Sequence, residues 1–222
     1  MAIILNIESS TKSTSVCVSE DGKILSIQEE HEVVSHATKL TPFILEVLKE
    51  AKIKMSDLDA IAISNGPGSY TGLRIGLSTA KGLCYALNIP LIAISALVAQ
   101  ANSLIGTNKK HNKLYASVMN SRKEEVYLCL LDSSFNILIK PTAIKVDVFF
   151  LQNYRNEELV IAGTGLEKIK KVIQQKNITY IEGLNFSAKD MSHPTFDLFS
   201  KSLFVDLAYS EPDYLKPFVI ST

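Results

Sequence analysis

The sequence of 222 residues has few cysteines, and its three, Cys17, Cys84 and Cys129, show no Cys-x-x-Cys spacing. An odd, scattered set of this kind argues against a disulfide framework. Each cysteine has apolar neighbours, as small buried residues usually do. We therefore expect reduced thiols and a cytoplasmic protein.

Net charge and long apolar runs are also missing. Lys and Arg total 23, Asp and Glu total 23, and the pI is 6.9, so no global field favours a phosphate backbone or an anionic membrane. The longest apolar stretch, around Leu83 to Ser95, is broken by Asn88 and Pro90, and no basic segment precedes the first apolar run. We expect neither a signal peptide, nor a membrane span, nor tight unaided binding of nucleic acid.

Several catalytic and ligand-binding motifs are absent as well. The chain has no Gly-x-Gly-x-x-Gly, no P-loop, no Gly-x-Ser-x-Gly and no Gly-Gly pair. His31 and His36 are five residues apart, which on a helix points them away from each other, and His111 and His193 have no ligand partner nearby in sequence. We predict no metal, no cofactor and no covalent nucleophile.

What the sequence does contain is a regular alternation of apolar elements. Apolar periodicity and turn residues predict the following order in the first hundred residues: strands at 3–7, 14–19 and 24–28, a helix on Leu40 to Ala51, a strand at 59–64, a helix at 72–87 and a strand at 90–95. Pro42 leaves the start of the first helix uncertain.

The second half repeats this order. It predicts strands at 113–119, 126–131 and 136–140, a short helix at 147–154, a strand at 159–162, a helix at 166–177 and a strand at 178–181. Two copies of β-β-β-α-β-α predict a duplicated mixed α/β fold. We place the first domain at 1–104, with a connecting helix near 96–104, and the second at 105–222, including an extended tail.

The turn after the first strand, Glu8-Ser9-Ser10-Thr11-Lys12-Ser13-Thr14, opens with an acid and is rich in hydroxyls. Such a composition suits a hairpin that grips phosphate or metal. It contains no glycine for close backbone approach, however, and a solvated hairpin tip whose hydroxyls bind their own backbone fits it better.

The loop Asn65-Gly66-Pro67-Gly68-Ser69-Tyr70-Thr71-Gly72 lies between a strand and a helix, where free N–H groups can bind an anion. It lacks the Lys-Ser/Thr end of a P-loop, so we interpret it as a tight structural turn.

In the helix that follows, Gly72, Gly76 and Ala80 form a strip of small residues, and Gly82 lies nearby. Each helical glycine costs about 1 kcal/mol against alanine, which implies a compensating close contact. Two interpretations stay open on the spacing alone: contact with this chain's own first helix, or contact of both helices with a second chain.

The duplicated order resembles the actin-like ATPase fold, which is ribonuclease-H-like. Within it, residues 7–11, 65–76 and 80–83 closely resemble the TsaB (YeaZ) family, the bacterial accessory subunit for threonylcarbamoyladenosine synthesis in tRNA. Looser similarity extends through His36, Met119 to Tyr127, Gly163 to Gly165 and Pro212 to Lys216.

This resemblance implies a non-catalytic subunit without cofactor that dimerises with the transferase TsaD and supports transfer of threonylcarbamoyl from threonylcarbamoyl-adenylate to adenosine 37 of tRNA. It further implies that a small ATPase, TsaE, joins the complex, that tRNA is contacted through the complex, and that the free chain could pair with its own copy. The expected partner interface comprises Leu40, Ile44, Val47, Tyr70, Gly72, Leu73, Gly76, Leu77 and Ala80. The turn Glu8, Ser9, Ser10 and Thr11 would be a degenerate phosphate turn.

The sequence departs from the family pattern at Glu8, which replaces the usual aspartate, and in the segment around Asn120, Ser121 and Glu124, where the family has Asp-Ala-Arg-x-Gly-Glu. The role of that segment is therefore open. A self-sufficient ATP-dependent enzyme of the same fold is the competing hypothesis. A metallopeptidase is a third, for which the sequence offers neither ligands nor a general base.

Overall fold

The computed structural model describes residues 1–30, 36–107, 112–184 and 186–216. The chain divides into two compact units, which are described separately. Unit 1 consists of Met1–Ala96 and Phe186–Asp213, and unit 2 of Leu97–Asn185 and Tyr214–Thr222.

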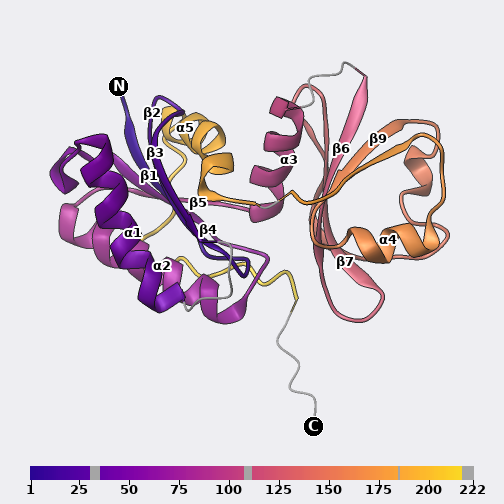
Figure 1. Cartoon of the computed structure of the whole chain (residues 1–222), viewed down its shortest axis with the longest axis horizontal. Coiled ribbons are helices and arrows are strands. Elements are labelled where there is room, and N and C mark those ends of the chain that lie inside the picture. Colours follow the sequence, from indigo (N-terminus) through magenta and orange to yellow (C-terminus); the bar gives the residue numbers. More distant parts are fainter. Residues whose placement is uncertain (31–35, 108–111, 185, 217–222) are drawn as a thin grey trace, which may run out of the picture. The chain divides into compact units, whose positions relative to one another are not determined.

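Unit 1 contains a five-stranded mixed sheet in the order β3-β2-β1-β4-β5 (Figure 1). Its strands are β1 (Ile3–Glu8), β2 (Thr14–Glu20), β3 (Lys23–Glu30), β4 (Ala60–Ser64) and β5 (Leu91–Ile94). The first three pair antiparallel, whereas β4 runs parallel to both β1 and β5. β1 and β4 are central strands, and both are almost entirely buried. The five strands predicted for this part of the chain are therefore confirmed.

Two long helices, α1 (His36–Ala51) and α2 (Tyr70–Leu87), lie side by side on unit 1 in Figure 1. α1 contacts β2 and β3, and α2 contacts β4. The buried residues of α1 recur at helical spacing: Leu40, Phe43, Ile44, Val47 and Leu48. This spacing places one apolar face on the sheet. Pro42 lies inside α1 and is exposed; the helix begins before it, at His36, and continues through it.

Residues Phe186–Asp213 belong to unit 1, which differs from the expected division of the chain. They include the 3₁₀ turn η3 (Ala188–Met191) and helix α5 (Ser192–Ser200). Thr195 Oγ1 donates to Oδ1 of the fully buried Asn6 at 2.7 Å, and the Val205 N–H donates to the Leu91 carbonyl at 3.0 Å. A buried amide needs such partners, because an unsatisfied polar group is costly.

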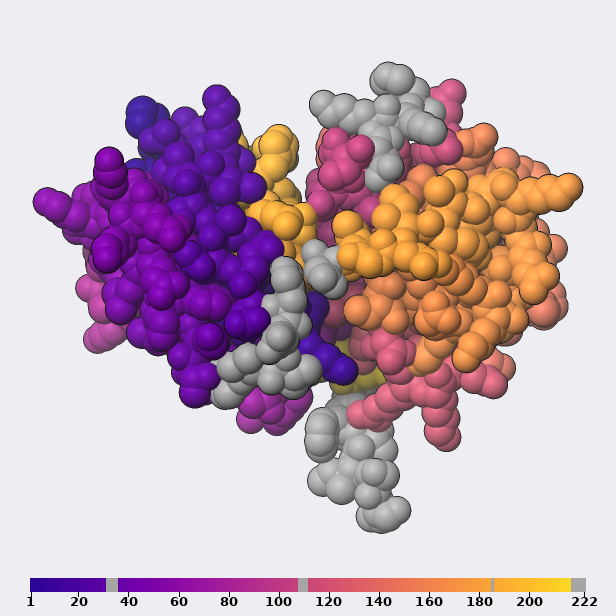
Figure 2. Space-filling view, viewed as in Figure 1, coloured from indigo at the N-terminus to yellow at the C-terminus, as the bar shows by residue number. Residues whose placement is uncertain are grey.

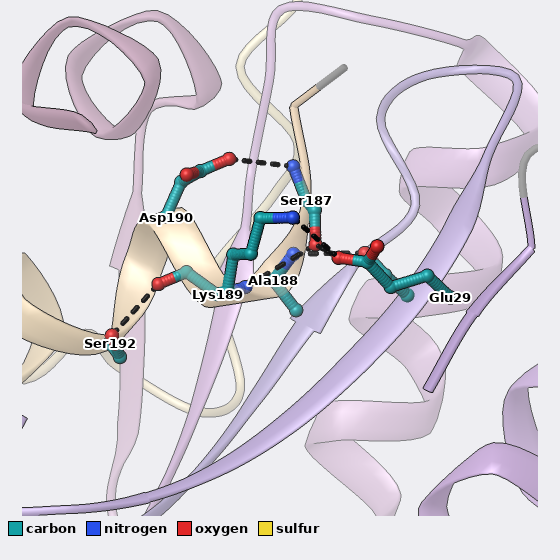
Figure 3. Close-up of polar contacts among 7 residues, drawn as sticks. Glu29, Ser187, Ala188, Lys189, Asp190 and Ser192 are labelled. Atoms are coloured by element: carbon teal, nitrogen blue, oxygen red, sulfur yellow. Dashed lines mark hydrogen bonds and ion pairs between the residues drawn. The ribbon is translucent and has the colours of Figure 1, made fainter. Parts of the chain in front are cut away.

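A polar cluster fixes the start of this segment on the sheet (Figure 3). The Ser187 hydroxyl donates to Glu29 of β3, and Lys189 Nζ lies 3.3 Å from the same carboxylate. The Ser187 N–H donates to Asp190 at 3.0 Å, and the Ala188 N–H donates to Ser15 Oγ at 2.9 Å. The segment is therefore attached to β2 and β3 by side-chain hydrogen bonds.

Unit 2 contains a second five-stranded sheet in the order β10-β9-β6-β7-β8. Its strands are β6 (Lys113–Asn120), β7 (Glu125–Asp132), β8 (Ile137–Lys145), β9 (Glu158–Ala162) and β10 (Ile178–Ile181), and its helices are α3 (Ala96–Thr107) and α4 (Leu166–Val172). The pairing repeats that of unit 1: three antiparallel strands, then two parallel ones. This repetition confirms the duplicated α/β fold.

Two helices predicted for unit 2 differ from those in the structure. The predicted helix at 147–154 is wrong: the chain makes turns there that end in the 3₁₀ turn η2 (Gln152–Tyr154). The helix predicted to reach residue 177 ends at Val172, because the chain becomes extended at Ile173. In the described parts of the chain, no helix is long and apolar enough to cross a membrane.

Candidate functional site

Glu8 ends β1 with its side chain fully buried. Its Oε1 accepts hydrogen bonds from the N–H and the hydroxyl of Ser10, at 2.6 and 2.5 Å. Its Oε2 has no hydrogen-bond partner. The Ser64 hydroxyl at the end of β4 is near enough to lower the pKa of the carboxyl, although Ser64 Oγ also lacks a hydrogen bond of normal geometry.

Burial raises the pKa of Glu8 from 4.5 to about 7, and the hydrogen bonds from Ser10 lower it only in part. Desolvation dominates because, among the described residues, only hydrogen bonds and no cation compensate the carboxylate for lost water. Such a carboxyl could exchange a proton near neutral pH. Its side chain is shielded from solvent.

The loop between β4 and α2 uses its own donors internally. Ser69 is the N-cap of α2 and its Oγ accepts from the Gly72 N–H at 3.2 Å. The Leu73 N–H donates to the Ser69 carbonyl, and the Ser69 N–H donates to the Ser10 carbonyl at 2.6 Å. These three donors at the start of α2 are thus bound to the chain itself.

The β1–β2 turn lies directly against the small residues of this loop and helix. A Cβ at Gly68 would lie 2.1 Å from the Ser10 carbonyl oxygen, and one at Gly72 would lie 2.1 Å from that of Ser9. At Gly76 it would lie 2.2 Å from Ser9 Oγ, which itself donates to the Gly72 carbonyl at 2.9 Å. The small-residue strip therefore accommodates this chain's own serine turn.

His36, the first residue of α1, completes this contact. Its Nδ1 lies 2.6 Å from Thr14 Oγ1. A Cβ at Gly72 would come within 3.0 Å of its Nε2. Burial lowers the pKa of His36, which favours the neutral ring, although contact with the Thr11 backbone raises it in part. Thr11 itself is half-buried, and its Oγ1 accepts from the Ser13 N–H at 3.2 Å.

Most residues of the expected partner interface are in the core of unit 1. The buried members are Leu40, Ile44, Val47, Gly72, Leu73, Gly76, Leu77 and Ala80; Tyr70 alone is exposed, at 41%. The apolar spacing identified the face that meets the sheet, and a buried face cannot also meet a second chain in this fold. The placement of these eight residues on a partner surface is corrected accordingly, because they are buried in unit 1.

The outward faces of α1 and α2 carry a different set of residues. Leu45 is 58% exposed and Tyr85 is 83% exposed. Tyr70 and Arg74 form a cation–π pair at 4.2 Å. Gly82 is exposed, and a Cβ there would meet no atom within 4 Å. Gly82 is therefore the one glycine of α2 for which this chain provides no close contact.

Unit 2 is also closely packed at the corresponding loops. A Cβ at Gly163 would lie 2.0 Å from the Val118 carbonyl oxygen, and one at Gly165 would lie 2.9 Å from Val126 Cγ1. The Asn120 N–H donates to Thr164 Oγ1 at 3.0 Å, so the β6–β7 turn is attached to this loop.

The histidines do not form a metal site among the described residues, where no group of three or more His, Cys, Asp or Glu is arranged to hold an ion. His193 is exposed on α5, 3.6 Å from Asp197. His31 and His111 lie outside the described residues.

Comparison with known proteins decides the family. The family model for TsaD, the tRNA N6-adenosine threonylcarbamoyltransferase, matches residues 29–216. A TsaB protein of Buchnera aphidicola subsp. Schizaphis graminum is 32% identical over 80% of this chain and 88% of its own length. This chain belongs to the TsaB (YeaZ) family. The TsaB of Escherichia coli is 26% identical over 96% of this chain and 94% of its own length.

Solved structures agree with this assignment. YeaZ from Pseudomonas aeruginosa superposes with a TM-score of 0.80 at 25% identity, covering 97% of this chain and all of that one. A polyphosphate/ATP-glucomannokinase from Arthrobacter shares the fold alone, with a TM-score of 0.53 at 10% identity over 90% of this chain. The curated TsaB relatives are named for tRNA threonylcarbamoyladenosine biosynthesis, and membership of their family supports a role in this tRNA modification.

Sequence reasoning missed two features of this site: the burial of Glu8 and the contact of His36 with the start of α2. The signal for both was a complementarity. The serine turn contains no glycine, whereas the start of α2, in the same unit, contains several. This is the pattern expected where the residues of the turn fill the space that the missing side chains of the helix leave.

Proposed function

We propose that this chain is a non-catalytic subunit that pairs with a TsaD-type transferase and supports transfer of threonylcarbamoyl from threonylcarbamoyl-adenylate to adenosine 37 of tRNA. A TsaE-type ATPase joins the complex, and the free chain uses the same surface to pair with its own copy. Family membership supports the pathway. The packing at the start of α2 supports the non-catalytic role of this chain beside a catalytic partner.

The observation that carries the proposal is the occupied start of α2. In a phosphate-binding loop, glycines leave backbone N–H groups open to the ligand. Here Ser9 and Ser10 lie where a ligand would approach, at distances that admit no additional atom at Gly68 or Gly72. The buried Glu8 holds Ser10 in this position. The turn is thus suited to support the helix rather than to bind nucleotide.

The outward faces of α1 and α2 are the proposed partner surface. Leu45 and Tyr85 offer apolar area without contacts in this chain that would bury it. Gly82 costs helix stability, about 1 kcal/mol against alanine, and no close contact within unit 1 offsets this cost. A helix of the partner that approaches closely at Gly82 would offset it. The buried strip of Gly72, Gly76 and Ala80 lies on the inner face of α2 and holds the helix against unit 1.

Gly82→Arg is the variant that tests this surface. The side chain at Gly82 would project into open space in the isolated chain, so the variant should fold. Gly76→Arg is unsuitable, because any side chain there collides with Ser9 and would disrupt unit 1. Gly106→Arg is the matched control: Gly106 is an exposed glycine of α3 with no neighbour within 4 Å of its Cβ position.

The assay measures incorporation of labelled threonine into unmodified tRNA by the transferase, the ATPase and the adenylate-forming enzyme, with each variant added. We expect Gly106→Arg to support incorporation and Gly82→Arg to fail, with loss of the heterodimer in analytical ultracentrifugation. Full incorporation without this chain would refute the proposed function. Micromolar, magnesium-dependent binding of ATP by the isolated chain, measured by calorimetry, would instead favour an enzyme.

A further inference from the structure

The neutral net charge of the chain conceals an asymmetry between its two units. Unit 2 contains thirteen Lys and Arg against eight Asp and Glu, a net charge of +5, and unit 1 contains ten against fifteen, a net charge of −5. An excess of positive charge on one unit attracts a polyanion to that unit even when the whole chain is neutral. The electrostatic argument against nucleic-acid binding therefore holds for the whole chain but not for unit 2.

Ion pairs within unit 2 neutralise part of its positive charge. Lys113 pairs with Glu158, Lys145 with Glu124, and Lys216 with Glu125. Within each pair the two charges cancel, so the pair does not attract a distant anion. At the end of α4, Lys170 pairs with Glu182, but the neighbouring Lys171 and Lys176 are exposed and take part in no described ion pair.

A shallow hollow opens beside these lysines. It is lined by Lys170, Ile173, Gln174, Gln175, Lys176 and Tyr180, which come from the last turn of α4, the segment after it and β10. Lys170 Nζ lies 5.5 Å from the centre of the Tyr180 ring, and the Tyr180 hydroxyl donates to the Ile173 carbonyl at 3.2 Å. These two contacts fix the ring as a wall of the hollow. Figure 2 shows the orange atoms of this part of unit 2 at the surface.

The lining combines three kinds of group that recognise RNA. Lysines bind phosphates, an aromatic ring packs against a base or ribose, and the carboxamides of Gln174 and Gln175 can bond base edges and the 2′-hydroxyl. Two acids, Glu182 and Glu167, act on Lys170. An acidic peptide would need only the lysines, and it would leave the ring and the amides unused.

We propose that the hollow at the end of α4 binds a segment of the tRNA backbone. This inference rests on the proposed function, because that function supplies tRNA as the substrate of the complex. The chain would then contribute a direct tRNA contact from unit 2, in addition to the contact with the transferase through unit 1.

The test compares Lys176→Glu with Lys140→Glu. Both residues are exposed lysines of unit 2, and both changes alter the net charge equally, but Lys140 is on β8, at the opposite edge of the sheet from β10. Labelled unmodified tRNA is titrated with the assembled complex by fluorescence anisotropy at 50 to 200 mM salt.

We expect Lys176→Glu to weaken binding at least about threefold at low salt and to lower the salt slope by about 0.7 to 0.9, the contribution of one phosphate contact. Lys140→Glu should change neither quantity. Tyr180→Leu should weaken binding about fivefold or more without changing the slope, because stacking involves no counterions.

Equal effects of the two lysine variants would overturn the inference, because binding would then depend on net charge alone. Sedimentation of each complex keeps the two proposals separate. If the complex fails to form, the proposed function fails, and the same titration with the chain alone still decides whether the hollow binds tRNA. If the complex forms and modifies tRNA but Lys176→Glu binds as wild type does, only the hollow is refuted.

Discussion

The buried carboxyl of Glu8 should make the stability of unit 1 depend on pH. The pKa of Glu8 is about 7 in the folded chain, against 4.5 for an unperturbed glutamate. Because the folded state binds the proton more tightly, the contribution of Glu8 to stability is complete below pH 4.5 and is lost as the pH rises toward 7. The difference between the two pKa values corresponds to about 3 kcal/mol.

Glu8→Gln isolates this effect. The amide oxygen can still accept the two hydrogen bonds from Ser10, but the side chain no longer ionises. Urea unfolding of both proteins from pH 4 to pH 8 should show wild type losing about 3 kcal/mol relative to the variant. The lowered pKa of His36 has the opposite sign, since its contribution is lost as the pH falls, and it cancels in this difference.

A companion variant sharpens the assay. The Ser10 hydroxyl lowers the pKa of Glu8, so Ser10→Ala should move the midpoint of the pH dependence upward. A difference between wild type and Glu8→Gln that stays constant across the pH range would refute the reasoning. It would mean that Glu8 is solvated, or paired with a cation, in the folded protein.

Three further outcomes follow from the packing of unit 1. Gly82→Ala should raise the free energy of unfolding by up to about 1 kcal/mol. Gly76→Ala should lower it by about 1 to 3 kcal/mol, because the new methyl group collides with Ser9 Oγ. Urea titration of both variants distinguishes the two faces of α2. Ser187→Ala should cost about 1 to 2 kcal/mol and increase amide hydrogen exchange in residues 186–200, because it removes the bond to β3 and the cap of η3. Lys81→Met should make residues 206–213 more sensitive to proteolysis, because Lys81 Nζ donates to two carbonyls of this segment.

The order of elements could be predicted from the sequence because each element carries a local signal. The apolar positions of α1 follow the helical period, and the strands are short apolar or alternating runs between turn residues. The duplication is visible in the same way, since both halves present three strands before the first helix. The prediction for 147–154 failed because the adjacent Phe150 and Leu151 reach the core from a turn, whereas Val148 and Phe149 are exposed, so the apolar run forms no helical face.

The attachment of residues 186–213 to unit 1 could not be predicted, because it depends on contacts between distant residues. Thr195 and Asn6, which are 189 positions apart, bond inside the core. Neither residue lies in a local sequence pattern that would identify the other as its hydrogen-bond partner. Contacts of this kind follow from the topology of the fold, which local sequence patterns do not reveal.

The small residues of α2 show where the limit lies within the site itself. At 100° per residue, Gly72, Gly76 and Ala80 share one side of the helix, whereas Gly82, although it is near them in sequence, points to another side. The spacing could therefore separate two sets of glycines, but it could not say which set faces inward. The serine turn decides that question, since Ser9 fills the space at Gly72 and Gly76 and leaves Gly82 outside.

This packing also separates the two faces of α2. A strand-to-strand turn that contains glycine leaves space where an anion can bind. Here the glycines are in α2 and the serines are in the turn, so the serines pack onto the surface of the helix and fill that space. The inner face of α2 then tolerates almost no substitution, so changes that affect a partner without unfolding the chain must come from its outer face. Variants at Gly82 and Tyr85 therefore test the proposed association, whereas variants at Gly72 and Gly76 test folding. An experiment that confuses the two faces would assign a folding defect to the proposed interface.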